Sequence, residues 1–173
     1  MSTEHWFVDE TKASGLTLVV VAVDASRVGR CRTELAALPR HPGAALRFTK
    51  ESDVVRKHAF RLISTLPLTV LTVSVPTRVR PVVARERAIR WIGRRAAATE
   101  PRRIILERDE VFERDDRRWL REELVAHPDV EYQHLAKGTD PLLWVADGIA
   151  WADQRGGAWR SAIEHLIVEH AQA

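Results

Sequence analysis

Acidic side chains end two apolar stretches of this sequence. The segments "FVDET" (7–11) and "RRIILERDE" (102–110) include apolar runs, predicted to be strands, that finish in carboxylates at Asp9 and Glu107. In α/β sheets, functional side chains gather at strand ends, where they can project into a shared crevice. If the two acids belong to one site, their strands should lie near each other in one sheet.

A third acid, Asp147, lies within the apolar segment "PLLWVADGIAWA" (141–152). It follows Leu143 by four residues and precedes Trp151 by four, so it shares a helix face with apolar side chains. An ionised carboxylate on a buried face is costly unless a cation or a metal ion pairs with it. The alternative is an amphipathic helix with Asp147 at its rim, and periodicity alone leaves both interpretations open.

The elements that would position these acids alternate between strands and helices. Hydrophobic spacing and turn residues predict six strands, at 5–9, 16–23, 45–48, 66–76, 102–110 and 130–135. They predict six helices, at 26–38, 51–65, 82–98, 113–126, 141–154 and 158–171. Residues 39–43 are predicted to be a loop. The first two strands should form a hairpin, and Asp140 and Pro141 should begin the fifth helix. This order predicts an α/β fold, a mixed sheet covered by helices.

Length and composition restrict the class of protein. A chain of 173 residues, 45% of them apolar, is expected to form a single domain over residues 1–173. It contains no apolar run of roughly 18 to 20 residues and no secretory signal pattern, so we expect a cytoplasmic protein without membrane contact. The single cysteine, Cys31, excludes an internal disulfide framework and a multi-cysteine metal site.

Arginine is unusually frequent and unevenly distributed. The chain has 23 Arg against 4 Lys, and nine of the arginines fall between residues 78 and 103, where only Glu86 and Glu100 oppose them. This segment is a candidate phosphate-facing surface, with Arg85, Arg87, Arg90, Arg94 and Arg95 as its proposed contacts. The alternative is an ordinary solvated helix face.

Taken together, "FVDET", "RRIILERDE" and "PLLWVADGIAWA" resemble motifs of the domain of unknown function 3800 family. "FVDET" is similar to the family's "DES" signature, "RRIILERDE" to its acid-ended internal strand, and "PLLWVADGIAWA" to its C-terminal Ala-Asp motif. The resemblance extends in order from Asp9 to Trp151. It implies an RNase H-like fold with carboxylates around one or two divalent metal ions.

The resemblance also implies which residues hold the metal. Asp9 matches the first-strand acid, Asp147 the C-terminal acid, and Glu107 the internal-strand acid, for which Asp109 is the less favoured choice. Glu51, at the start of the predicted second helix, would be a fourth ligand, although an acid in a first helical turn is also stabilised by the helix dipole alone. The chain departs from the family pattern by Thr11 in place of Ser and by Glu in place of Asp at 107. Carboxylate oxygens suit Mg²⁺ or Mn²⁺.

Other polar residues could assist at such a site. His134, at a predicted strand end, could carry a proton, or it could be a strand-end histidine without a chemical role. Lys12, Lys50 and Lys137 could hold phosphate oxygens. Aromatic content is only 6%, so no base-stacking platform is evident, and we expect the tryptophans to serve packing.

These observations together favour a metal-dependent nuclease, a hydrolase of nucleic-acid phosphodiesters that uses Mg²⁺ or Mn²⁺. The catalytic set would be Asp9, Glu51, Glu107 and Asp147, with His134. The alternative is a non-catalytic module that binds nucleic acid or protein on an RNase H-like fold. The sequence does not distinguish RNA, DNA and hybrid substrates, and it leaves open whether a protein partner is needed.

Overall fold

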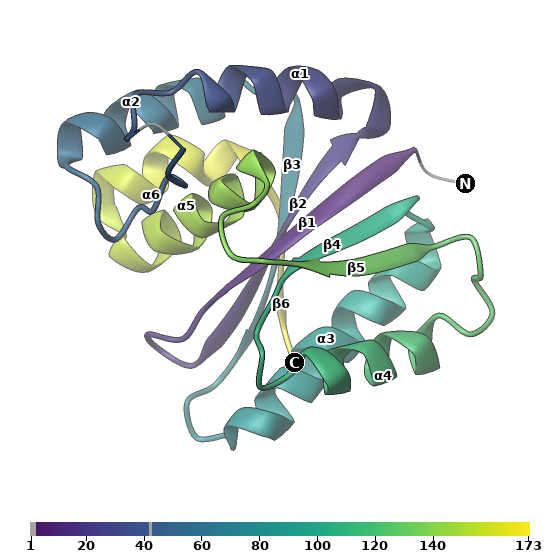
Figure 1. Ribbon diagram of the computed structural model, residues 1–173. Helices are drawn as coiled ribbons and strands as arrows, with labels where there is room; N and C mark the ends of the chain where they lie inside the picture. The colour runs from purple at the N-terminus through teal and green to yellow at the C-terminus, as the bar shows by residue number, and fades with distance from the viewer. Residues whose placement is uncertain (1–2, 42) are drawn as a thin grey trace.

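A single six-stranded sheet with helices on both faces forms the body of the computed structural model, which describes residues 3–41 and 43–173 (Figure 1). Residues 1, 2 and 42, which fall in the predicted domain and the predicted 39–43 loop, lie outside the described part. The elements are β1 (Glu4–Thr11), β2 (Leu16–Asp24), α1 (Ala25–Ala36), α2 (Asp53–Ile63), β3 (Leu68–Val75), α3 (Pro81–Thr99), β4 (Arg103–Glu107), α4 (Glu113–Glu123), β5 (Glu131–Leu135), α5 (Pro141–Arg155), α6 (Gly157–Ile163), the 3₁₀ turn η1 (Glu164–Leu166) and β6 (Ile167–Gln172).

The strands lie in the order β5-β4-β1-β2-β3-β6. β1, β2 and β3 pair antiparallel, whereas β4 pairs parallel with β1, β5 with β4, and β6 with β3. The predicted mixed sheet and the predicted β1–β2 hairpin are therefore confirmed. The parallel pairing of β1 with β4 brings the two acid-ended strands side by side.

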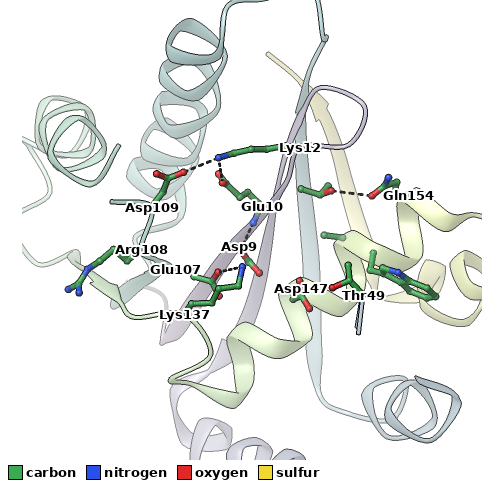
Figure 2. Close-up of a pocket in the computed structure, with 13 residues that line it drawn as sticks. Asp9, Glu10, Lys12, Thr49, Glu107, Arg108, Asp109, Lys137, Asp147 and Gln154 are labelled. Atoms are coloured by element: carbon green, nitrogen blue, oxygen red, sulfur yellow. Dashed lines mark hydrogen bonds and ion pairs between the residues drawn. The ribbon is translucent and has the colours of Figure 1, made fainter. Parts of the chain in front are cut away.

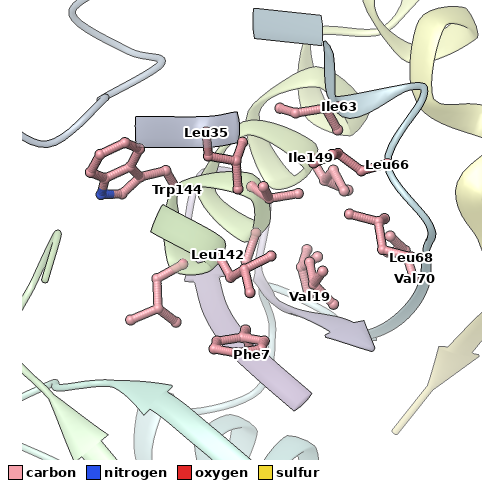
Figure 3. Close-up of a cluster of buried hydrophobic side chains, with 14 of the residues drawn as sticks. Phe7, Val19, Leu35, Ile63, Leu66, Leu68, Val70, Leu142, Trp144 and Ile149 are labelled. Carbon is pink, nitrogen blue, oxygen red and sulfur yellow. The ribbon is translucent and has the colours of Figure 1, made fainter. Parts of the chain in front are cut away.

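Each face of the sheet carries its own apolar layer, because successive side chains of a strand point to opposite faces. Phe7 and Val19 pack beneath α5 together with Leu142 and Ile149 (Figure 3). Trp6 and Val8, which point to the other face, pack against α3 and α4. Figure 1 shows α1, α2, α5 and α6 on one side of the sheet and α3 and α4 on the other.

The central helix of the first layer, α5, is apolar on nearly all sides. Asp140 is its N-cap and accepts a hydrogen bond from Leu142 N at 2.9 Å, with Pro141 in the first turn, as predicted. A Cβ at Gly148 would stand 2.6 Å from the Phe48 ring, so glycine lets the 44–50 loop lie directly on the helix. This close approach shapes the candidate site described below.

Two predicted elements differ in the structure. Residues 45–48 form no strand: Leu46 and Phe48 are buried in the core, and Arg47 O closes a turn by accepting from the backbone N–H groups of residues 50 and 51. The predicted helix 158–171 ends at Ile163, and residues 167–172 instead form β6. Without β6, one edge of β3 would have no strand partner. The backbone hydrogen bonds that residues 167–172 form at this edge outweigh the helix propensity of the segment.

Within residues 3–41 and 43–173, no helix has both the length and the apolar composition that crossing a membrane requires.

Candidate active site

Asp9 and Glu107 lie side by side at the carboxyl ends of two parallel strands. Val8 of β1 is in register with Leu106 of β4, so the following residues, Asp9 and Glu107, are neighbours on the face covered by α5. Asp9 accepts a hydrogen bond from Glu10 N at 2.7 Å and is only 6% exposed. The prediction that the strands ending in these two acids lie near each other in one sheet is confirmed by this register.

Asp147 approaches the same place from α5. Its carboxylate accepts a hydrogen bond from Phe48 N at 3.2 Å, a contact that the missing side chain at Gly148 permits. The sequence left open whether Asp147 lies at a rim or on a buried face. It is partly buried beneath the 44–50 loop and faces the cavity that Asp9 and Glu107 line.

A solvent-open cavity of about 440 Å³ unites the three acids. Figure 2 shows Asp9 and Glu107 next to Lys137, with Asp147 and Thr49 on the opposite wall. The wall residues that sequence reasoning did not identify are Glu10, Thr11, Thr49, Arg108, Ala150, Trp151 and Gln154. Of these, Trp151 and Gln154 follow Asp147 by four and seven residues, so helical spacing could have revealed them, whereas Thr49 reaches the cavity only through tertiary folding.

The electrostatics of the cavity show that the carboxylates act on one another. Burial, followed by the charges of Glu107 and Asp147, raises the pKa of Asp9 well above its ordinary value. Burial is also the largest cause of the raised pKa of Asp147, to which Glu107 contributes. Lys137 opposes both shifts and pairs with Glu107 at 3.2 Å. Five acids but only three cations line the cavity, so its wall carries an excess of negative charge when these groups are ionised, a condition that favours binding of a cation.

This charge predicts a pH-dependent effect of Asp9→Asn. Because the folded protein raises the pKa of Asp9, ionisation of Asp9 costs stability as pH rises from the unfolded pKa of about 4 through the folded value. Asn carries no such cost, so the free energy of unfolding of the variant relative to wild type should rise over this interval. Urea unfolding in EDTA between about pH 4 and 8 measures the difference. A difference that stays constant or falls with pH would contradict the assignment.

Two lysines border the cavity. Lys137 lies in the loop after β5, where Gly138 has φ +75° and Trp144 Nε1 donates to the Gly138 carbonyl at 3.0 Å. Lys12, at the end of the β1–β2 hairpin, bridges Glu10 at 2.7 Å and Asp109 at 2.9 Å. Asp109 is thus a partner of Lys12 at the rim, and Glu107 is the acid that lies beside Asp9.

Two further predicted residues lie outside the cavity wall. The Glu51 carboxylate accepts from Arg47 N at 3.5 Å and closes the turn before α2, so we leave it out of the site. Lys50 is exposed next to Thr49, a wall residue, and forms no ion pair within the described part of the chain.

His134 lies on the opposite face of the sheet. It is 4% exposed, and its Nε2 lies 3.2 Å from Asp116 of α4. Asp116 in turn accepts two hydrogen bonds from Arg85 of α3, at 2.7 and 3.0 Å, and Arg85 also pairs with Glu10. His134 is therefore hydrogen-bonded to a buried ion-pair chain that runs from Asp116 through Arg85 to Glu10, and the structure does not place it where it could serve the three acids.

The same ion-pair chain changes the interpretation of the α3 arginines. Arg85 is 3% exposed and cannot reach a phosphate without leaving two carboxylates. Arg90 pairs with three glutamates, Arg94 with Glu123, and Arg95 with Glu169. Arg87 alone of the five is exposed without an ion pair in the part of the chain that the structure describes. This helix face is largely neutralised by the protein's own acids.

Comparisons with solved structures agree with this architecture. The chain superposes on the RNase HII complex with PCNA from Archaeoglobus fulgidus with a TM-score of 0.55 and 20% identity, covering 94% of this chain and 76% of that one. It superposes on ribonuclease H2 from Pyrococcus horikoshii with a TM-score of 0.51 and 17% identity, covering 94% and 75%. The fold is RNase H-like. No protein-family model and no curated protein matches the sequence.

The donor set of this RNase H-like chain fits a hard divalent cation. The three cavity acids offer only oxygen, as Mg²⁺ and Mn²⁺ prefer, and, after burial, the charge of Glu107 raises the pKa of Asp9 and of Asp147. Among residues 3–41 and 43–173, no three or more acid, histidine or cysteine side chains lie close enough together to hold a metal ion as they stand. Mg²⁺ retains several waters and needs only one or two direct carboxylates, so acids that line one open cavity can hold it without being drawn together.

Proposed function

We propose that this chain is a divalent-metal-dependent nuclease that hydrolyses nucleic-acid phosphodiesters, and that it belongs to the domain of unknown function 3800 family. The observation that supports this most strongly is the convergence of Asp9, Glu107 and Asp147 on one open cavity. The RNase H-like fold is consistent with the proposal, and the two structures compared above are ribonucleases by name.

In this proposal, Asp9, Glu107 and Asp147 hold Mg²⁺ or Mn²⁺. When bound, such ions activate water and stabilise the leaving oxygen of a phosphodiester. The cavity walls orient the strand, and Asp147 is held in place by the Phe48 N–H. Lys137 leaves Glu107 and turns to a phosphate oxygen, and Lys12 and Lys50 contact phosphates at the rim. His134 has no part in this proposal.

A cleavage panel tests the proposal. The purified chain is incubated with labelled single-stranded, duplex and hybrid RNA and DNA in Mg²⁺, in Mn²⁺ and in EDTA. We expect metal-dependent cleavage of at least one substrate and none in EDTA. Binding without cleavage in every metal would instead support the second candidate, a non-catalytic nucleic-acid-binding module, which the Lys137–Glu107 ion pair favours because an internal cation already sits at the acids.

A further inference from the structure

A second hollow lies between α2 and α6, on the same side of the sheet as the acid cavity. It has a volume of about 330 Å³; Phe60, Ala158, Trp159 and Ala162 form its apolar floor, and Lys57 and Arg61 are its cations. We call it the aromatic groove. Figure 1 shows α2, α5 and α6 gathered at one end of the sheet.

The aromatic groove connects to the acid cavity through two tryptophans. Trp159, in the groove, meets Trp151 edge-on with ring centroids 5.2 Å apart, and Trp151 lines the acid cavity. Both rings pack against the core, as expected, but they are half-buried and keep part of their surface exposed. A strand that leaves the cavity past Trp151 would meet Trp159 next.

The two cations of the groove have no ion-pair partner among residues 3–41 and 43–173. Lys57 and Arg61 are one helical turn apart on α2, are exposed, and form no ion pair within the described ranges. The nearby acid Asp53 is already paired with Arg56 at 2.8 Å, and Arg56 stacks over Trp151 at 4.5 Å. A cation without an internal partner is free to neutralise a phosphate and so displace a counterion from the nucleic acid, whereas the paired arginines of α3 would first have to leave their carboxylates.

We propose that the aromatic groove binds a base and the adjacent phosphate of the nucleic-acid strand whose scissile bond lies at the three acids. An aromatic floor stacks any base, and two free cations one turn apart suit the charged backbone. The inference rests on the proposed function and adds to it a site for the strand beyond the cavity. An acidic peptide would use the two cations but would gain nothing from the connection to the acid cavity.

The test measures binding of a fluorescein-labelled single strand of about 12 nucleotides in EDTA by anisotropy over a range of salt concentrations. Lys57→Gln/Arg61→Gln should weaken binding about five-fold or more and lower the salt slope by about 1.4, since each lost contact on a single strand removes about 0.7. The matched control is Arg114→Gln/Arg121→Gln, which removes two exposed arginines from α4 on the other face that form no ion pair in the described part of the chain. It should change affinity by less than about two-fold.

Trp159→Leu, with Trp159→Phe as its conservative partner, separates stacking from charge. Leu should weaken binding by about five-fold or more without changing the salt slope, and Phe should retain most of the affinity. The proposal that the groove binds the strand would be overturned if the groove and control double variants bound with equal affinity. It would also be overturned if a polyglutamate peptide competed as well as unlabelled nucleic acid does. If wild type cleaves nucleic acid while the groove variants bind as the control does, the proposed role of the groove is rejected and the proposed nuclease function stands. If wild type neither binds nor cleaves any substrate, the proposed function fails as well.

Discussion

Asp147→Asn should abolish metal-dependent cleavage while leaving the apoprotein folded. We expect the rate to fall by more than about 100-fold, because even residues that only support metal ligands cost about 10- to 100-fold when mutated. In EDTA the variant should melt at the wild-type temperature or above it, since burial and the charge of Glu107 raise the pKa of Asp147 and a neutral amide avoids that cost. The amide oxygen can still accept from Phe48 N.

The control is Asp153→Asn on the same helix. Asp153 lies outside the acid cavity and pairs with Arg160 at 3.4 Å. Its substitution should alter the cleavage rate by less than about two-fold, as expected when only a partly exposed ion pair is lost. A cleavage rate of Asp147→Asn close to that of Asp153→Asn, or an EDTA melting temperature well below wild type, would indicate that Asp147 has a structural role.

Asp116→Ala should cause the largest loss of stability. Asp116 is fully buried and accepts two hydrogen bonds from Arg85, which is itself 3% exposed. Burial alone would raise the pKa of Asp116, but the hydrogen bonds from Arg85 and His134 outweigh it and lower the pKa. Removal of the carboxylate leaves a buried cation with Glu10 as its remaining partner, which should cost about 3 to 5 kcal/mol. Urea unfolding measures the loss.

Two further variants identify the cause of that loss. Glu122→Gln removes a partly exposed partner of Arg90 and should cost less than about 1 kcal/mol. The double change Arg85→Met/Asp116→Leu should recover most of the stability lost in Asp116→Ala, because replacing a buried ion pair by apolar groups is often nearly neutral. If Asp116→Ala costs no more than Glu122→Gln does, the buried ion pair is not the source of stability that its geometry indicates.

The sequence predicted those parts of the fold that local pattern determines. Two apolar runs on either side of a short polar turn located β1 and β2, and the apolar run with Asp140 and Pro141 located α5. The errors arose where contacts with distant parts of the chain determine the secondary structure. Residues 167–172 became β6 because β3 has a free edge, and residues 45–48 stayed a loop because Leu46 and Phe48 pack into the core without a strand partner.

The same distinction applies to the site. Asp9, Glu107 and Asp147 could be predicted because each is an acid that ends or interrupts an apolar run. The sequence of β5 does not show which face of the sheet His134 occupies. The strand has only five residues, and apolar and polar side chains alternate weakly along it.

The burial of Arg85 could have been inferred from sequence. Ala88, Ile89 and Ile92 follow it by three, four and seven residues, so Arg85 shares the apolar face of α3. Asp116 likewise precedes Trp119 and Leu120 by three and four residues on α4. Opposite charges on the apolar faces of two successive helices are a pattern that indicates a buried pair.

The most direct measurement of the central claim is a thermal melt in Mn²⁺ of wild type beside Asp147→Asn. A ligand at about 100 times its Kd stabilises the folded state by about 2.7 kcal/mol, which for a chain of this size raises the melting temperature by about 5 to 10 °C. We expect that rise for wild type and almost none for Asp147→Asn, with Asp153→Asn behaving as wild type. A wild-type protein that does not respond to Mn²⁺, or an Asp147→Asn variant that keeps the full rise, would contradict the claim that these acids form a metal site.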